Sequence, residues 1–340
     1  MLVLDAGPNA DHAPPFEVDG GRVMPPTEVP ARMDAIRHGL ARVPATRFEK
    51  PSPHGRATAW LHDLDYRAFL RETCDELRRS PADRPLDPLF PSVFPYRAGQ
   101  TGMSLKGRLG QYCFDTHTPL LPGTFDAALR TVAAAVHAAD VVASGIERLV
   151  YALGRPPGHH AEKARYGGYS YLNATAHAAD RLSNSGPVAV LDIDVHHGNG
   201  TQHLFYDRRD VFTVSVHGDP AFLFPHFSGF ADETGTGPGL GANLNLPLWL
   251  KTDDRTYQPA LETALERIAR SRPAFLVVAV GYDAHERDPI GGFALTTPYY
   301  ETVGRTVRQL GLPTVVVQEG GYGLADLSDL AAAFGRGLVG

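Results

Sequence analysis

Asp194 and His196 place a carboxylate and an imidazole two residues apart in the stretch LDIDVHHGNG, residues 191–200. They come directly after an apolar, β-branched run, residues 188–193, which predicts a buried strand. Because the two residues alternate with apolar ones, both side chains point to the same side of an extended backbone. Their oxygen and nitrogen donors suit zinc, although iron(II), cobalt or manganese could also bind. Each residue alone is explained equally well as a turn or cap residue.

A second predicted strand supplies a third ligand of the same kind. The apolar run at residues 274–281 is followed by Asp283. Parallel strands of open α/β folds present such residues at a shared carboxyl edge. With Asp194 and His196, Asp283 would form a three-ligand site that leaves room for a water and a substrate oxygen. This open arrangement is typical of a catalytic metal.

Two adjacent histidines, His159 and His160, follow a third predicted strand on a turn that contains two prolines and a glycine. Imidazoles on a rigid turn suit proton transfer near neutral pH. Each imidazole needs a partner that fixes its tautomer, and Asp192 and Asn199 lie on the metal-binding stretch. Because a carboxylate raises imidazole basicity more than an amide does, we expect the two histidines to differ in role.

Tyr322 follows Gly320 and Gly321 after a fourth predicted strand, residues 314–318. Its hydroxyl could donate a hydrogen bond to an oxyanion. A tyrosine after two glycines is a weak signal by itself. Four polar clusters after four strands are much harder to explain as unrelated caps, so the sequence favours a catalytic site.

Composition limits the class of protein. The chain has 340 residues, a net charge of −6 and 43% hydrophobic residues. It has no basic stripe for nucleic acid, and no apolar run approaches the roughly 18 residues of a membrane span. Cys74 and Cys113 are too few for a disulfide framework, and the N-terminus does not resemble a signal peptide. We expect a cytoplasmic protein with one catalytic domain, residues 1–340, and no nucleic-acid or membrane partner.

Strands and helices alternate along the chain. The sequence predicts strands at 2–4, 149–153, 188–193, 211–217, 274–281 and 314–318, and helices at 28–41, about 64–77, 124–144, 171–182, 256–271, 298–310 and 327–338. This alternation predicts an α/β fold with a largely parallel sheet and helices on both faces. Residues 80–108 are rich in proline and show little periodicity, which indicates an insertion near the active site or at a subunit contact.

Three motifs resemble the signatures of the zinc-dependent histone deacetylase superfamily. They are RPPGHHA at 155–161, DIDVHHGNG at 192–200 and EGGY at 319–322. Within the superfamily the chain is most similar to bacterial acetylpolyamine amidohydrolases, through GDPA at 218–221 and FPHF at 224–227. The resemblance covers the whole chain. It implies the arginase/deacetylase fold, with a central eight-stranded parallel sheet flanked by helices.

The resemblance implies a role for each polar cluster. Asp194, His196 and Asp283 would bind one zinc ion per chain. A structural potassium ion would be held by Asp192, Asp194, His196, Ser215 and Val216.

The catalytic groups are assigned in the same way. His160, near Asn199, would be the general base that activates water and then protonates the leaving amine. His159 would pair with Asp192, and Tyr322 would bind the substrate carbonyl.

Gly168, Tyr169 and Phe224 look like walls of the substrate tunnel, and residues 80–108 resemble an insertion that makes the polyamine branch dimerise and narrows its active site. The implied partners are therefore a small acylated amine and a second copy of the chain.

Two positions depart from the polyamine branch. His117 stands where that branch has an acidic residue for a distal ammonium, with Asp115 close by, and Asp19 stands where it can have a tyrosine. Because the rest of the chain resembles that branch, we expect an acetylpolyamine or related acetylated amine as substrate. A non-polyamine acetamide and acetyl-lysine in peptides stay as alternatives.

Two other classes are open on the same fold. A two-manganese ureohydrolase would need further aspartate ligands, but His197 and Gly198 follow the first pair, and Ala284 and His285 follow Asp283. A binding module without catalysis would not need the two histidines and the tyrosine. Both alternatives fit the sequence less well than a deacetylase does.

Overall fold

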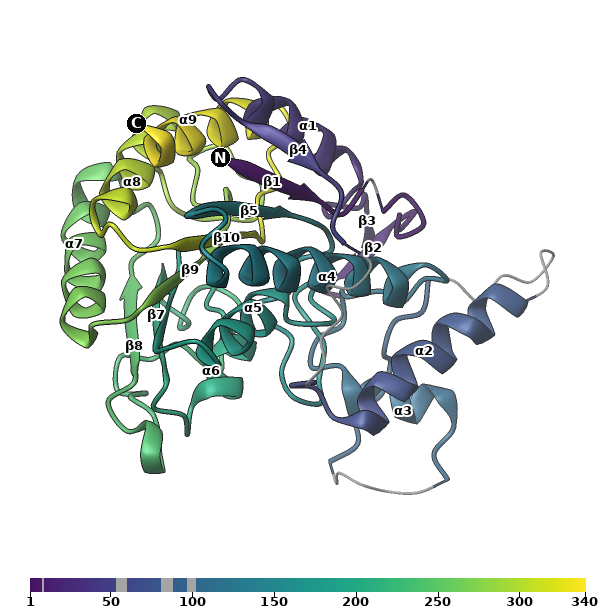
Figure 1. Ribbon diagram of the computed structural model, residues 1–340. Coiled ribbons are helices and arrows are strands. Elements are labelled where there is room, and N and C mark those ends of the chain that lie inside the picture. Colours follow the sequence, from purple (N-terminus) through teal and green to yellow (C-terminus); the bar gives the residue numbers. More distant parts are fainter. Residues whose placement is uncertain (8, 53–59, 81–87, 97–101) are drawn as a thin grey trace.

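A parallel eight-stranded sheet forms the centre of the computed structural model, which describes residues 1–7, 9–52, 60–80, 88–96 and 102–340 (Figure 1). The strand order is β4-β1-β5-β10-β9-β6-β7-β8, and every neighbouring pair is parallel. The strands are β1 Leu2–Asp5, β4 Arg47–Glu49, β5 Leu149–Leu153, β6 Val188–Asp192, β7 Val211–Gly218, β8 Asn243–Leu248, β9 Phe275–Val280 and β10 Thr314–Gln318. The predicted sheet is confirmed.

Helices cover both faces of this sheet (Figure 1). The helices are α1 Ala31–Ala41, α2 Leu64–Arg79, α3 Leu105–Tyr112, α4 Thr124–Ala143, α5 Ala174–Ser183, α6 Asn199–Phe205, α7 Asp254–Ser271, α8 Thr297–Gln309 and α9 Leu327–Val339. Buried side chains of α2, α4 and α5 pack on one face, and those of α1, α7, α8 and α9 pack on the other. Within the described residues, no helix is both long and apolar enough to cross a membrane.

The central strands are apolar on both sides because both faces are covered. In β10, Val315 and Val317 join one hydrophobic core, whereas Val316 joins the other. A strand that is buried on both faces has a continuous hydrophobic sequence, which explains why the central strands could be predicted. The two edge strands were not predicted. β4 has only three residues, Arg-Phe-Glu, and β8 alternates buried asparagines with partly buried apolar residues.

The structure corrects part of the prediction for residues 80–108. Helix α3 begins at Leu105, so the irregular stretch ends before 108. Leu89 and Leu120 form an antiparallel bridge through two backbone hydrogen bonds of 2.9 Å, which ties this segment to the body of the protein. Residues 81–87 and 97–101 of the proposed insertion lie outside the described residues. A small antiparallel hairpin, β2 Glu17–Asp19 and β3 Arg22–Met24, was also not predicted.

The strand order brings the predicted site together. β5, β10, β9 and β6 are neighbours at the centre of the sheet, although they are far apart in sequence. The four polar clusters follow these four strands at their carboxyl ends. Because adjacent parallel strands are about 4.8 Å apart, their side chains can reach one another across this edge.

A buried ion cluster connects two of these strand ends. Arg155, after β5, and Arg32, on α1, are both fully buried and both pair with the carboxylate of Glu28. Arg32 also donates to the carbonyl oxygens of Glu319 and Gly321, after β10. Burial alone would raise the pKa of Glu28, but the two guanidiniums lower it to about 2. Glu28 therefore stays charged in the folded protein.

Glu28→Gln should lower the free energy of unfolding at pH 7 by about 3 to 5 kcal/mol, because it leaves two buried guanidiniums without a counter-charge. Since the pKa of Glu28 falls on folding, its charge stabilises the protein fully above pH 4.5 and this contribution disappears as the pH falls towards about 2. Urea unfolding measures the effect. Glu266→Gln, in an exposed pair with Arg270, is the matched control and should change stability by less than about 1 kcal/mol. Equal losses for both variants would contradict the prediction.

Candidate active site

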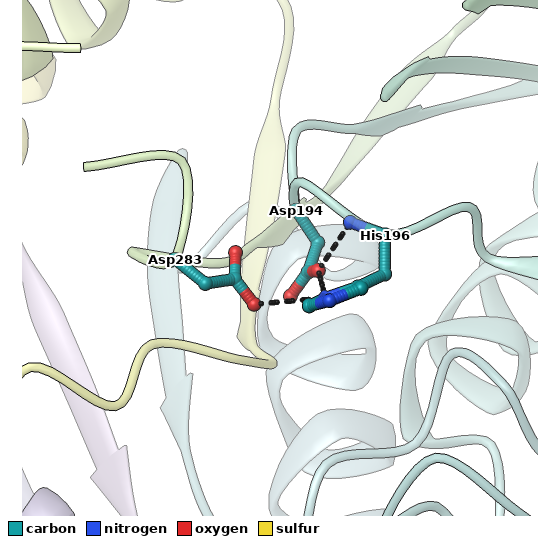
Figure 2. Close-up of side chains that lie close together, drawn as sticks. All are labelled: Asp194, His196 and Asp283. Carbon is teal, nitrogen blue, oxygen red and sulfur yellow. Dashed lines mark hydrogen bonds and ion pairs between the residues drawn. The ribbon is translucent and has the colours of Figure 1, made fainter. Parts of the chain in front are cut away.

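Asp194, His196 and Asp283 form one cluster at the carboxyl edge of the sheet (Figure 2). Each offers a ligand atom, and these atoms all lie within 4.8 Å of one another. His196 Nδ1 lies 3.1 Å from Asp194 Oδ1 and 3.3 Å from Asp283 Oδ2. All three residues are buried, so their donors face one another with little competition from solvent. The cluster has the donors and the spacing that a divalent metal requires.

The electrostatics of this cluster favour a positive charge. Burial alone would lower the pKa of His196, but the carboxylates of Asp194 and Asp283 raise it to about 10. Burial and the charge of Asp194 raise the pKa of Asp283. Asp283 Oδ2 accepts no hydrogen bond from any described residue. An unsatisfied buried carboxylate oxygen is costly, and a bound cation would satisfy it.

Backbone groups fix the two carboxylates in place. Asp194 Oδ2 accepts from Gly320 N at 2.8 Å, and Asp283 Oδ1 accepts from Val195 N at 3.0 Å. A Cβ atom at position 320 would lie 2.1 Å from Asp283 Oδ2. The glycine after β10 is therefore required for the close approach of this strand end to the carboxylates.

The two histidines have different partners. His159 Nδ1 lies 2.9 Å from Asp192 Oδ2, and His160 Nδ1 lies 2.8 Å from Asn199 Oδ1. Burial alone would lower the pKa of His159, but Asp192 and Asp194 raise it to about 10. Burial lowers the pKa of His160 well below its ordinary value, and positive charge on His159 and His196 adds to this effect. The structure therefore holds one charged and one neutral imidazole side by side, with ring centroids 4.0 Å apart.

Glu319 positions the histidine turn, a contact that sequence reasoning missed. Its Oε2 accepts from Gly158 N at 2.6 Å and from His159 N at 3.1 Å, and its Oε1 accepts from Thr175 Oγ1 at 2.6 Å. Glu319 precedes the Gly-Gly pair of the EGGY motif, and nothing local in the sequence shows that it reaches residues 158 and 159.

Tyr322 lines the active-site cavity, which His160 and His196 also line. Asp288 holds its backbone, since Asp288 Oδ2 accepts from Tyr322 N at 2.7 Å and from Gly323 N at 3.1 Å. The guanidinium of Arg32 lies 4.5 Å from the centre of its ring. Burial raises the pKa of the Tyr322 hydroxyl, which therefore keeps its proton and can donate a hydrogen bond.

A cavity of about 660 Å³ opens in front of these residues. Its buried lining residues are Glu17, Asp115, His160, Gly168, Tyr169, His196, Pro225 and Tyr322, and its partly buried or exposed ones include Asp19, Met24, Phe94, Phe114, His117, Phe224 and Phe227. The structure thus brings the predicted tunnel residues to one cavity, which reaches the predicted metal group at His196. Phe94, from the proline-rich stretch, also lines it.

Gly168 and Tyr169 form a tight turn against the histidines. Both have positive φ angles, 54° and 61°. A Cβ atom at position 168 would lie 2.3 Å from His160 Cδ2, so only glycine leaves room for this ring. The Tyr169 hydroxyl donates to Glu17 Oε2 at 3.0 Å. Glu17 lines the cavity and was missed, because a single glutamate in a short irregular segment carries no sequence signal.

The three residues of the predicted distal site differ in what they can contact. Asp115 is buried, and its two oxygens accept from His117 N, Thr118 N, Thr118 Oγ1 and Gly168 N, with a longer contact from Cys113 Sγ at 3.7 Å. A carboxylate has about four acceptor positions, so Asp115 supports the turn and has little capacity left for a substrate ammonium. His117 is 23% exposed, with Nε2 3.4 Å from Asp115 Oδ2. Asp19 is exposed at the cavity and keeps its carboxylate available.

The predicted potassium ligands are also neighbours. The register of β6 and β7 places Asp192 opposite Ser215, and Val216 follows in β7. Asp192 Oδ1 accepts from Asp194 N at 3.1 Å, which connects this pair to the metal group. Ser215 Oγ lies 2.8 Å from His217 Nδ1.

Among the residues that the structure describes, Asp194, His196 and Asp283 are the only group of three with metal-ligand spacing. A two-manganese site of the ureohydrolase type is therefore not favoured.

Comparison with known proteins agrees with this geometry. The family model for the histone deacetylase domain matches residues 26–338. An acetylpolyamine amidohydrolase from Mycoplana ramosa is 41% identical over 332 residues, covering 95% of each chain. Acetylpolyamine amidohydrolase 1 from Pseudomonas aeruginosa is 39% identical, over 95% of this chain and 94% of that protein.

A solved structure gives the same result. The crystal structure of acetylpolyamine aminohydrolase from Burkholderia pseudomallei superposes with a TM-score of 0.92 at 35% identity, covering 99% of this chain and 98% of that one. The sheet order, the buried Asp-His-Asp group and these matches lead to one conclusion. The chain has the arginase/deacetylase fold and belongs to the histone deacetylase family.

Proposed function

We propose that this deacetylase removes acetyl groups from acetylated polyamines. The observation that carries the proposal is a buried metal-ligand group beside a histidine pair, at the end of a cavity whose charged lining suits a cation. The cavity is lined by the exposed carboxylate of Asp19 and, among its described lining residues, by no lysine or arginine, whereas Glu17 and Asp115 also line it but already accept hydrogen bonds from the chain. Relatives named acetylpolyamine amidohydrolases match nearly the whole chain. A carboxylate-lined cavity attracts amines with a distal ammonium group.

We propose zinc as the metal, one ion per chain, held by Asp194, His196 and Asp283. Two oxygens and one nitrogen with an open position suit a catalytic zinc ion, which polarises a substrate carbonyl and lowers the pKa of a bound water. We further propose a structural potassium ion behind it, held by residues around Asp192 and Ser215. The adjacency of these two residues across β6 and β7 supports this assignment.

The residues around the metal group have separate tasks in the proposed reaction. His160 accepts the proton of the attacking water at Nε2, since its Nδ1 is occupied by Asn199, and then gives this proton to the leaving nitrogen. The hydroxyl of Tyr322 donates a hydrogen bond to the carbonyl oxygen as negative charge develops there. His159, paired with Asp192, supplies a positive charge close to the reacting atoms.

Asp283→Ala should bind zinc far more weakly and lose deacetylase activity, because it removes one of three protein ligands. Elemental analysis after dialysis should find one zinc per chain in the wild type, together with potassium, and well below one zinc in the variant. Asp232→Ala changes an exposed aspartate and is the matched control. A variant that keeps one equivalent of zinc and full activity would refute the site, and wild-type protein without potassium would refute the second ion.

Wild-type enzyme should hydrolyse N-acetylputrescine with a kcat/KM about tenfold or more above that of N-butylacetamide, its neutral analogue, and far above that of acetylated histones. The exposed carboxylate of Asp19 attracts the distal ammonium electrostatically, so Asp19→Asn and added salt should both reduce this preference. The neutral substrate should be unaffected by either change. Equal kcat/KM values for the two amides would refute the polyamine assignment and leave the deacetylase chemistry intact.

We also propose a homodimer, formed through the proline-rich segment. Three of its described hydrophobic side chains are exposed, Val93 to 53%, Phe94 to 47% and Tyr96 to 92%. Exposed apolar side chains in one segment are typical of a protein interface. Sedimentation equilibrium should give about twice the chain mass of 36.7 kDa, and a mass equal to a single chain would contradict the dimer.

A further inference from the structure

Asn199 lies between the two cavities of this region. It does not line the active-site cavity, but it lines a second cavity of about 290 Å³. Glu162 lines this second cavity and follows the histidine turn by two residues. A charged residue therefore approaches the partner of His160 from the side opposite to the reaction.

The side-chain amide of Asn199 is fixed by what surrounds it. Its Oδ1 lies 2.8 Å from His160 Nδ1, and its Nδ2 donates to Glu162 Oε1 at 3.0 Å and to the backbone oxygen of His160 at 3.3 Å. The opposite orientation of the amide would place Oδ1 against a carboxylate and a carbonyl oxygen, with no donor between them. Glu162, with the shorter contact, and the His160 carbonyl together select the orientation in which Oδ1 faces the imidazole.

This orientation determines which nitrogen of His160 carries the proton. An amide oxygen can only accept, so His160 Nδ1 must be protonated and Nε2 must hold the lone pair. We infer that Glu162 is a positioning residue for the general base, acting through Asn199. The inference rests on the proposed function, because the tautomer of His160 affects the reaction only if His160 is the general base.

The backbone of Glu162 is held rigidly enough for this task. Its N–H donates to Arg165 O at 2.9 Å, and its carbonyl oxygen lies 2.7 Å from His62 Nδ1. Because Asn173 N donates to His62 Nε2 at 2.9 Å, His62 carries its proton on Nδ1 and donates it to Glu162. Burial lowers the pKa of His62 to about 3, which keeps this histidine neutral and the arrangement unchanged at physiological pH.

The contacts of the Glu162 side chain point to the same role. Among the described residues it forms no ion pair, and the hydrogen bond to Asn199 is the one that its carboxylate makes. A glutamate that served only stability or solubility would need no buried amide as its partner. Its place beside the active-site amide is explained by the orientation of that amide.

The test is steady-state kinetics of the zinc-loaded enzyme with N-acetylputrescine. Glu162→Ala should lower kcat about tenfold, the lower end of what the loss of an outer hydrogen-bond partner costs, with KM within about twofold of the wild type. Glu162→Gln keeps an acceptor oxygen for Asn199 Nδ2 and should recover most of kcat. Lys163→Ala, at the exposed neighbouring position, should behave as the wild type.

A double-mutant cycle separates positioning from general damage. In an Asn199→Ala background, Glu162→Ala should have no further effect, because the residue through which it acts is gone. A wild-type kcat for Glu162→Ala, failure of Glu162→Gln to recover activity, or an equal loss in both backgrounds would each overturn the inference. Two further measurements separate the proposed function from the positioning role. If wild-type enzyme does not hydrolyse N-acetylputrescine, the proposed function fails, and if His160→Ala retains wild-type kcat, the general-base role of His160 fails. An inactive His160→Ala beside a fully active Glu162→Ala defeats the positioning role alone.

Discussion

The concentration of buried negative charge at one edge of the sheet determines most of what surrounds it. Asp192, Asp194, Asp283 and Glu319 are all buried there. An uncompensated buried ion costs several kcal/mol, so each carboxylate needs a nearby positive charge or hydrogen-bond donors. His159 and His196 supply charge, and backbone N–H groups around the glycines of the strand ends supply donors. A bound cation would complete the compensation at Asp283, whose second oxygen lacks a donor among the described residues.

The sequence predicted the parts of the structure that depend on short-range patterns. The central strands are apolar on both faces, and parallel strands place the residues that follow them at one edge, so the sequence predicted that Asp194 and Asp283 share this edge. That they meet there depends on the pairing of β6 with β9, which the sequence did not predict. The edge strands β4 and β8 could not be predicted, because one side of each is not covered by another strand and their apolar pattern is weak. The sequence does not predict contacts such as that of Glu17 with Tyr169, because these two residues are 152 positions apart in the chain.

Asp115 shows why residue type and proximity do not define a role. Its place two residues before His117 suggested a contact to a substrate ammonium, but hydrogen bonds from the chain occupy its oxygens. Asp19, with the same side chain, is exposed and keeps its acceptors for a ligand. The difference comes from the backbone of residues 117, 118 and 168, whose N–H groups turn towards Asp115, and such a fold of the backbone cannot be read from residue identities.

The position of β10 in the sheet determines when the sheet can be completed during translation. β10 lies between β5 and β9, although it is the last strand in the sequence. During synthesis, the edges of β5 and β9 therefore have no partner until residues 314–318 leave the ribosome. Unpaired apolar strand edges are prone to join other chains. The nascent protein thus exposes this edge of β5 once residue 153 is made, and that of β9 once residue 280 is made, until β10 follows, and a chaperone that shields strand edges would protect it in this interval.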